Sequence, residues 1–209
     1  VVSASASLPL VYLTDKNKPS PMTAPNFCML LRKHIQNGRI VDISQPSLER
    51  ILEFTIEHLD EMGDLCRKKL IVELMGKHSN LIFVNQEGKI IDSIKHISSA
   101  VSSLREVLPG REYFIPETTQ KLNPLSTTKE EFYAHVYGQN TECFKALYTT
   151  YVGLSPFMAN EICFRAGGNC DLSIAALSET DKENLYTSFA VMIADIKNAN
   201  YAPRILYEN

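Results

Sequence analysis

The spacing of hydrophobic residues changes once along this 209-residue chain, and the change predicts two different halves. Up to about residue 124, apolar residues recur at every second position, which is the pattern of half-buried β-strands. From Thr128 onward they recur every three to four positions, as on amphipathic helices. We therefore expect an α+β protein, with a β-rich domain over residues 1–124, a helical domain over 125–200, and an extended segment over 201–209 that is a candidate to return to the β domain.

The β-rich half is expected to contain several strands and one helix. The helix is predicted over residues 25–37, because Pro25 suits a first turn and Gly38 suits a C-terminal cap. Gln86-Glu87-Gly88 has the composition of a hairpin turn between the last two strands. The predicted strands cover residues 8–14, 40–45, 49–57, 69–74, 80–85 and 89–97.

Two capping boxes mark helix starts in the second half of the chain. Thr128 is followed three residues later by Glu131, and Ser178 is followed by Asp181. Together with the apolar spacing they predict helices over residues 129–137, 141–151, 156–166 and 178–198. The last helix carries a stripe expected to be buried, made of Leu185, Phe189, Met192 and Ile196.

Composition limits the class of protein. With 44% hydrophobic and 22% charged residues and no long apolar run, the chain is expected to be globular, without a membrane span. The five cysteines are odd in number and lack zinc-type spacing, which is typical of reduced thiols in a cytoplasmic protein. Residues 1–7 carry neither an initiator Met nor a signal-peptide pattern, so we expect an internal start in a longer protein.

Positive charge is clustered locally in a chain whose net charge is −3. A nucleic-acid contact must therefore be local, because the overall charge does not favour one. The loop over residues 75–80 offers the cationic groups of Lys77 and His78, with hydrogen-bonding side chains at Ser79 and Asn80. Such a loop suits phosphate or sugar contacts and equally an ordinary turn. Further candidates for phosphate contact on the predicted helix are Arg32 and Lys33.

Arg50 stands out because of its place in the predicted strand over residues 49–57. Strict alternation puts its side chain on the core-facing side and Glu49 on the opposite side. A guanidinium is rarely buried without a partner, so Arg50 must reach the rim of the sheet or pair with a carboxylate. On periodicity alone, an edge residue in a local salt bridge is the favoured interpretation.

The segment over residues 153–162 has the residue pattern of a helix-hairpin-helix turn. Gly153 allows a tight turn, Ser155 can cap the next helix and Pro156 can begin it. Backbone N–H groups at such a helix start can hold a phosphate without reading sequence. Simple packing of two helices explains the same residues equally well.

Catalytic and metal-binding motifs are missing from the sequence. It contains no glycine-rich phosphate loop, paired-cysteine motif, His-Glu-x-x-His or Gly-x-Ser-x-Gly elbow. The five histidines are scattered without metal-ligand spacing. We therefore expect no enzyme, no metal and no cofactor.

Several blocks, read in chain order, resemble the NFACT-N domain of the RqcH family of ribosome quality control factors. The most specific is Met75-Gly76-Lys77-His78-Ser79-Asn80, and the others are residues 3–9, 26–34, 48–54, 92–96 and 108–110. Residues 153–167 resemble the helix-hairpin-helix domain that follows in this family. The resemblance implies a β-rich sandwich related to the N-terminal domain of formamidopyrimidine-DNA glycosylases, then a small helical domain. It also implies that the leading strands, coiled coil and C-terminal RNA-binding domain lie outside this sequence.

The resemblance further implies a non-catalytic RNA-binding role. Members of the family bind large ribosomal subunits obstructed by peptidyl-tRNA, and bacterial members recruit alanyl-tRNA to add C-terminal alanine tails. An Asp-Arg pair of the family contacts the anticodon arm of tRNA, and the matching positions here are Glu49 and Arg50. The acid is therefore one methylene longer than in the family pattern.

Two other functions compete with this one. Older names of the family suggest an adhesin that binds fibronectin or fibrinogen, which the absence of a secretion signal disfavours. Fold kinship alone suggests a DNA-repair glycosylase, although fold does not carry function. That chemistry needs an N-terminal proline nucleophile and usually a zinc finger, and the sequence supplies neither.

Overall fold

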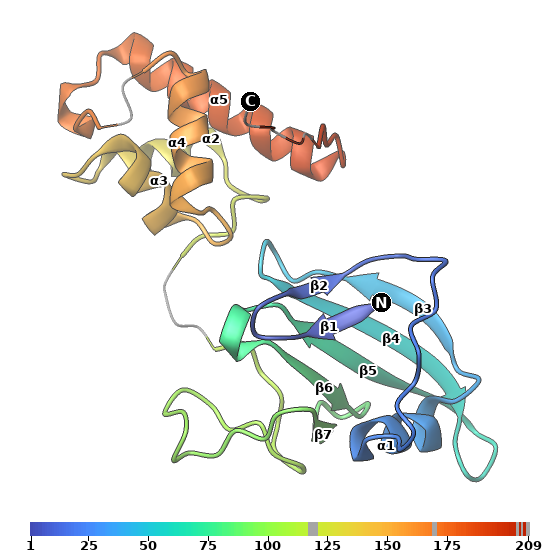
Figure 1. The fold of residues 1–209 in the computed structure, drawn as a ribbon. Coiled ribbons are helices and arrows are strands. Elements are labelled where there is room, and N and C mark those ends of the chain that lie inside the picture. Colours follow the sequence, from blue (N-terminus) through green and yellow to red (C-terminus); the bar gives the residue numbers. More distant parts are fainter. Residues whose placement is uncertain (117–120, 169–170, 204, 206, 208–209) are drawn as a thin grey trace. The chain divides into compact units, whose positions relative to one another are not determined.

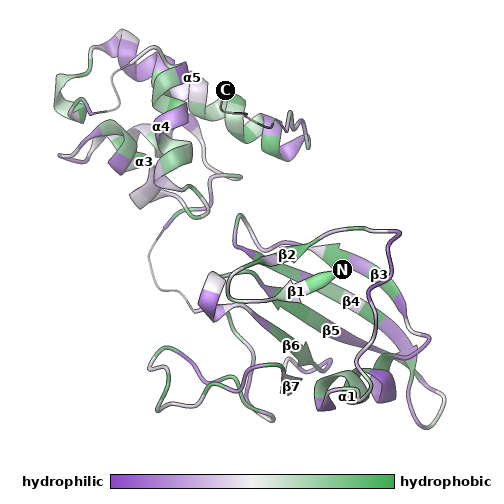
Figure 2. Ribbon diagram, viewed as in Figure 1, coloured by the Kyte–Doolittle hydropathy of each residue, from purple (hydrophilic) through white to green (hydrophobic). Residues whose placement is uncertain are grey.

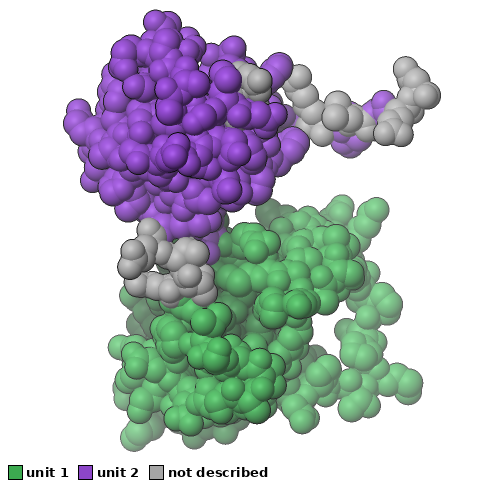
Figure 3. Space-filling view, turned by 90° about the vertical axis from the view of Figure 1, so that its left-hand side faces the viewer, with its two compact units in different colours: residues 1–46, 50–118 green, residues 47–49, 119–209 purple. Residues whose placement is uncertain are grey.

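The protein is described by a computed structural model, which covers residues 1–116, 121–168, 171–203, 205 and 207. The chain divides into two compact units (Figure 3). The first contains residues 1–46 and 50–118, and the second contains residues 47–49 and 119–209. The division falls a few residues before position 124, and one short segment from between two strands belongs to the helical unit.

The first unit is built on an antiparallel sheet of five strands in the order β3-β4-β5-β6-β7 (Figure 1). A separate ladder pairs β1 (Val2–Ala4) with β2 (Pro9–Val11), and β1 was not expected from the sequence. The expected hairpin turn joins β6 to β7, with Gly88 N donating to Asn85 O at 3.2 Å. The five strands are β3 (Arg39–Ser44), β4 (Ile51–Leu59), β5 (Leu65–Glu73), β6 (Asn80–Val84) and β7 (Ile90–Ser93).

Both faces of the sheet bury apolar side chains, and Figure 2 shows its central strands mostly in green. One face lies against the segment that follows β7, where Val107 is fully buried. The other face carries α1 (Asn26–Ile35), whose His34 ring lies 5.9 Å from that of Phe83. The core of the first face consists of Ile51, Ile71, Ile82, Val84, Ile90 and Val107.

The end of α1 differs from the sequence prediction. The helix is capped at Gln36, and the residue with a positive φ of 64° is Asn37, not Gly38. Gly38 serves another purpose, because a Cβ there would lie 2.9 Å from Cγ2 of Ile56 on β4. A glycine is therefore needed for close approach of the chain to the sheet, while asparagine tolerates the left-handed backbone.

The second unit contains four α-helices within its described residues. The two predicted capping boxes are confirmed at Thr128/Glu131 and Ser178/Asp181. A 3₁₀ turn (Ile174–Ala176) precedes the last helix. The helices are α2 (Lys129–Tyr137), α3 (Cys143–Thr150), α4 (Pro156–Arg165) and α5 (Glu179–Lys197).

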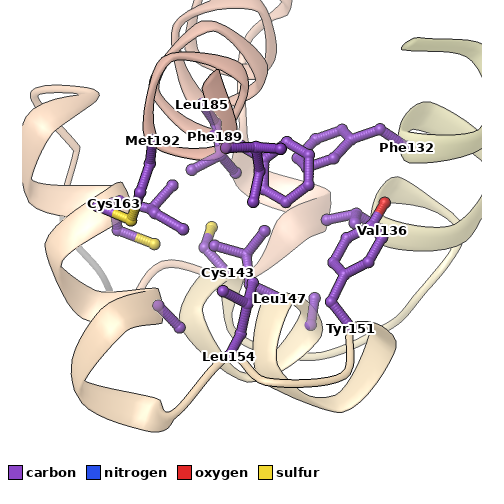
Figure 4. Close-up of a cluster of buried hydrophobic side chains, with 14 of the residues drawn as sticks. Phe132, Val136, Cys143, Leu147, Tyr151, Leu154, Cys163, Leu185, Phe189 and Met192 are labelled. Atoms are coloured by element: carbon purple, nitrogen blue, oxygen red, sulfur yellow. The ribbon is translucent and has the colours of Figure 1, made fainter. Parts of the chain in front are cut away.

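Aromatic packing around Phe132 forms the centre of this helical core (Figure 4). Its ring lies 4.7 Å from that of Phe189 and 5.3 Å from that of Tyr186, so α2 and α5 are joined by ring contacts. The predicted stripe on α5 faces this core, with Leu185, Phe189 and Met192 buried and Ile196 partly buried. The predicted extended segment after α5 falls partly outside the described residues, and residues 203, 205 and 207 lie in no strand.

Candidate nucleic-acid interface

The sheet of the first unit has two ends, and the predicted contact residues fall on both. The Arg50 end is where β4 begins, β5 ends and β6 begins. The Arg39 end is where β3 begins, β4 ends and β5 begins. The nine residues of β4 separate the ends by roughly 27 Å at about 3.4 Å per residue. In Figure 1 the Arg50 end, with the short turn before β6, lies at the left of the sheet, and α1 lies at the lower right.

Arg50 lies just before β4, and its side chain is exposed. Its carbonyl accepts a hydrogen bond from Leu74 N at 2.8 Å, which fixes the backbone at the rim of the sheet. Of the two alternatives that the sequence left for Arg50, the structure shows the rim, because β4 begins only at Ile51, whose side chain is buried at 1% exposure. Within the described residues no carboxylate forms an ion pair with the Arg50 guanidinium. The expected local salt bridge is therefore not found there.

Lys77 and His78 lie in a 3₁₀ turn (Gly76–His78) at the same end, and both are exposed. The turn begins two residues after Leu74, which pairs with Arg50. Lys95 reaches the same turn, because its Nζ lies 3.4 Å from Lys77 O and 3.4 Å from Ala4 O. The three predicted cations Arg50, Lys77 and His78 thus share one end of the sheet.

Ser79 and Asn80 do not act as the sequence suggested, because both are fully buried. Ser79 Oγ accepts from Met75 N at 2.8 Å and closes the turn. Asn80 Nδ2 donates to Lys95 O at 2.9 Å, and Asn80 Oδ1 accepts from Lys95 N at 3.0 Å. A side chain without exposed surface cannot touch an external phosphate. These two residues are therefore not phosphate contacts. Their side chains instead support the loop on which Lys77 and His78 are exposed.

Arg32 and Lys33 lie in the last turn of α1, toward the Arg39 end, and both are exposed. Lys33 Nζ is 3.6 Å from Oε1 of Glu61, an acid in the loop after β4. These two residues are therefore separated from Arg50 by most of the length of β4. The predicted contact residues form two groups and not a single cluster.

Three cations at the Arg39 end, namely Lys33, Arg39 and Arg67, pair with carboxylates, whereas Arg32 and Lys68 form no ion pair among the described residues. Arg67 donates to Glu57 Oε2 at 3.0 Å, and Arg39 Nη2 lies 3.4 Å from Glu57 Oε1. The hydrogen bond from Arg67, followed by that from Arg39, lowers the pKa of Glu57 below its ordinary value despite the opposing effect of desolvation. Positive charge here is largely balanced within the protein.

Glu49 belongs to the helical unit, whereas Arg50 belongs to the sheet unit. The segment Ser47–Glu49 is anchored within the helical unit by Ser47 Oγ, which donates to Asn123 Oδ1 at 2.8 Å. The Glu49 side chain is half-buried. Its role beside Arg50 remains a prediction from the family pattern.

Comparison with known proteins identifies the family. The family model described as NFACT N-terminal and middle domains matches residues 1–209. This chain belongs to the NFACT-N family. It is 35% identical over 210 residues to the Rqc2 homolog RqcH of Bacillus subtilis, and this match covers 100% of the chain and 35% of that protein. The RqcH of Streptococcus suis is 38% identical over 163 residues, covering 78% of the chain and 29% of that protein. The NFACT-N chain thus spans about a third of the length of these curated relatives.

Solved structures share the fold. The N-terminal part of the fibronectin/fibrinogen-binding protein from Streptococcus suis matches with a TM-score of 0.73 and 33% identity, over 90% of this chain and 67% of that one. The fibrinogen-binding protein from Staphylococcus aureus matches with a TM-score of 0.74 and 31% identity, over 94% and 65%. The α+β architecture of the NFACT-N chain is therefore that of known family structures.

In the predicted helix-hairpin-helix turn of the NFACT-N chain, Leu48 packs directly against Gly153. Gly153 has a φ of 78°, and a Cβ there would lie 2.2 Å from Cβ of Leu48. The glycine is thus required for packing of Leu48 against the turn. Ser155 caps α4 as expected, since its side chain accepts from Met158 N at 3.2 Å. Phosphate binding at this turn stays a prediction.

Sequence reasoning missed the buried ion pair that supports the Arg50 end. Both carboxylate oxygens of Glu73, at 1% exposure, accept from Nη2 of Arg105, and Tyr113 Oη donates to Glu73 Oε1 at 3.0 Å. Burial, followed by the charge of Glu73, raises the pKa of Tyr113. Arg105 also donates to Phe114 O at 2.8 Å, so it joins two parts of the segment after β7, while its bonds to Glu73 fasten that segment to β5. The sequence signal that could have indicated this ion pair is the alternation along β5, which puts Glu73 on the same buried face as Ile71.

No group of three or more His, Cys, Asp or Glu side chains suited to a metal ion occurs among the residues that the structure describes. None of the described helices is both long and apolar enough to cross a membrane. Cys28 and Cys66 are free thiols, and Cys170 lies outside the described residues.

Proposed function

We propose that this NFACT-N chain is a non-catalytic, cytoplasmic RNA-binding module of a ribosome quality control factor, and that it grips tRNA through the Arg50 end of its sheet. Membership of a family whose curated relatives are named RqcH supports the general role. The observation that carries the specific proposal is the exposed Arg50 side chain, which has no ion-pair partner among the described residues.

Charge chemistry supports phosphate as the group bound at this end. A planar guanidinium can donate two parallel hydrogen bonds to a phosphate, which a lysine ammonium cannot do. Lys77, exposed on the neighbouring turn, adds positive potential where the net charge of the chain is −3, and the exposed His78 beside it can donate a hydrogen bond. Backbone phosphates are read without base specificity, so this contact positions tRNA and does not select it.

The wider role we propose follows the family. In the full-length factor, the module binds large ribosomal subunits that carry peptidyl-tRNA and brings in alanyl-tRNA for C-terminal alanine tailing. Arg50 together with Glu49 addresses the anticodon arm, with Lys77, His78, Arg32 and Lys33 as further phosphate contacts. The fold kinship to a glycosylase N-terminal sandwich and the helix-hairpin-helix identity of the second unit are part of the same proposal.

The test is tRNA binding by an Arg50→Ala variant, measured by fluorescence anisotropy with end-labelled tRNA at low salt. We expect a loss of about tenfold in affinity, since a charge-assisted hydrogen bond contributes about 1.5–3 kcal/mol. The matched control is Arg111→Ala, which removes an equally exposed arginine that pairs with Glu106 at 2.8 Å. If both variants bind like the parent, or lose affinity equally, the assignment to Arg50 is wrong.

A second candidate is binding of fibronectin or fibrinogen, which the printed names of the solved structures report for those proteins. Surface plasmon resonance with immobilised fibronectin and fibrinogen tests it. Saturable binding that is indifferent to Arg50→Ala and is not displaced by tRNA would favour this alternative. Absence of binding, with tRNA bound, favours the RNA-binding module.

A further inference from the structure

Three reactive side chains meet on the α1-bearing face of the sheet, away from the Arg50 end. Cys66 pairs directly across the ladder with His58, and Lys68 follows two residues later on the same face. Cys66 Sγ lies 3.1 Å from His58 Nε2. Lys68 Nζ lies 2.7 Å from the same nitrogen and 3.7 Å from the sulfur. A thiol, an imidazole and an ammonium group thus lie in mutual contact.

The imidazole is held in a single tautomer. His58 is buried at 7% exposure, and its Nδ1 lies 2.9 Å from the carbonyl oxygen of Leu59. Because a carbonyl can only accept, Nδ1 carries the ring proton. Nε2 is then left with one lone pair, aimed at Cys66 and Lys68.

That lone pair cannot serve both donors. Lys68 is the nearer donor at 2.7 Å and takes it. A neutral Cys66 thiol then has no free acceptor among the described residues, and its proton is left to solvent. An ionised sulfur has no proton to place and accepts from the Lys68 ammonium. The geometry therefore places the Lys68 ammonium where it can stabilise negative charge on the Cys66 sulfur during reaction.

We infer that Cys66 is a nucleophilic modification site of this chain, which forms reversible mixed disulfides with small disulfide compounds. A nucleophile beside a base that a third group orients is the geometry of an activated thiol. Cys66 is half-buried, so its sulfur can be reached from solvent. The site lies away from Arg50, on the α1-bearing face of the sheet with Ile56 and Phe83.

The reaction is a thiol–disulfide exchange. The Cys66 sulfur attacks one sulfur of the small disulfide, the new S–S bond forms, and the old S–S bond breaks. The Cys66 thiol releases its proton to solvent, and the leaving group departs as a thiolate that takes up a proton from solvent. Cys66 is oxidised to the disulfide level, and one half of the reagent is reduced to a thiol. A second thiol reverses the step.

Cys28 provides a control within the same chain. Like Cys66 it is half-buried, but no imidazole or ammonium group contacts it among the described residues. The 209-residue chain is treated at pH 7 with 2-hydroxyethyl disulfide, an uncharged reagent that is not steered by surface charge. The reaction is stopped with acid, and mass spectrometry of the peptides gives the modification rate of each cysteine.

We expect Cys66 to react at least about tenfold faster than Cys28, as cysteines beside cationic groups do. Lys68→Met should reduce the Cys66 rate to within about twofold of Cys28, and Lys68→Arg should retain most of it. Lys69→Met, on the opposite face and paired with Glu53 at 2.8 Å, should change nothing. Circular dichroism checks that each variant is folded.

Two outcomes would overturn the inference. The first is a Cys66 rate equal to or below that of Cys28 in the parent chain, which needs no variant at all. The second is a fast Cys66 rate that Lys68→Met and Lys69→Met affect equally. Either result would mean that the cluster does not activate the thiol.

Discussion

The two ends of the sheet carry similar residues but expose different amounts of unpaired charge. At the Arg39 end, Arg39 and Arg67 share Glu57, and Lys33 lies beside Glu61. At the Arg50 end, Arg50 and Lys77 have no carboxylate in ion-pair contact within the described part of the chain. The comparison teaches that a count of basic residues does not locate an anion-binding surface. What matters is which cations the fold leaves without a carboxylate.

The ends also differ in what supports them. The Arg50 end is held by buried polar bonds, namely the ion pair between Glu73 and Arg105 and the paired bonds between Asn80 and Lys95. The Arg39 end relies on ion pairs whose cations are 64% and 81% exposed. Buried polar contacts are costly to break, whereas exposed ion pairs contribute little. The residues around the candidate interface are therefore held by polar contacts that cost more free energy to break than those at the Arg39 end.

The largest effect is expected from Glu73→Gln, which leaves the Arg105 charge without its buried partner. We expect a loss of about 3–5 kcal/mol in the free energy of unfolding, measured by urea denaturation. The control Glu53→Gln removes a carboxylate on the same face whose partner, Lys69, is 48% exposed and can turn to solvent, and it should cost less than about 1 kcal/mol. Equal losses in the two variants would remove the distinction between the buried and the exposed pairs.

A smaller effect is expected from Asn80→Ala, which leaves the backbone N–H of Lys95 without its side-chain partner and the C=O of Lys95 with only Ser93 Oγ. Loss of these buried bonds should cost about 1–3 kcal/mol in the free energy of unfolding. Amide hydrogen exchange should show faster exchange confined to the Met75–Ser79 loop and to Lys95. An unchanged exchange pattern would contradict the supporting role that we assign to Asn80.

The smallest effect concerns pH at the Arg39 end. The pKa of Glu57 in the folded chain lies below its ordinary value of 4.5, mainly because of Arg67 and then Arg39. The stability that Glu57 contributes should be complete above pH 4.5 and should vanish as pH falls through the lower folded value. The difference in urea midpoint between the parent and Glu57→Gln, followed from pH 7 to acid, measures it. A difference that grows on acidification would have the wrong sign.

Local signals in the sequence were sufficient for much of the fold. The box at Thr128 and Glu131 places the start of α2, since the cap residues are adjacent in sequence and act without tertiary context. The change of apolar period likewise separates the sheet from the helices. Alternation alone could not place the Arg50 side chain, because β4 begins at Ile51 and Arg50 lies outside the regular pleat, at the rim of the sheet.

The candidate site was less predictable because burial depends on contacts distant in sequence. Ser79 and Asn80 look like polar loop residues, but both side chains are buried by hydrogen bonds. Ser79 bonds to Met75, and Asn80 bonds to Lys95, which is fifteen residues away. The contact between Cys66 and His58 depends on the register of two strands, which the sequence spacing alone does not give. The positions of the charged and polar side chains could therefore be predicted only in part from the sequence.

The most direct test of the account compares the two ends in one binding experiment. The salt dependence of tRNA affinity is measured for Arg50→Gln/Lys77→Gln and for Arg32→Gln/Lys33→Gln, which remove equal charge. The account predicts that the first variant lowers the slope of log affinity against log salt by about 1–2, as expected when phosphate contacts are lost, and that the second changes it by less than half as much. An equal change in both slopes, or a larger change for the second variant, would contradict the claim that tRNA is bound at the Arg50 end.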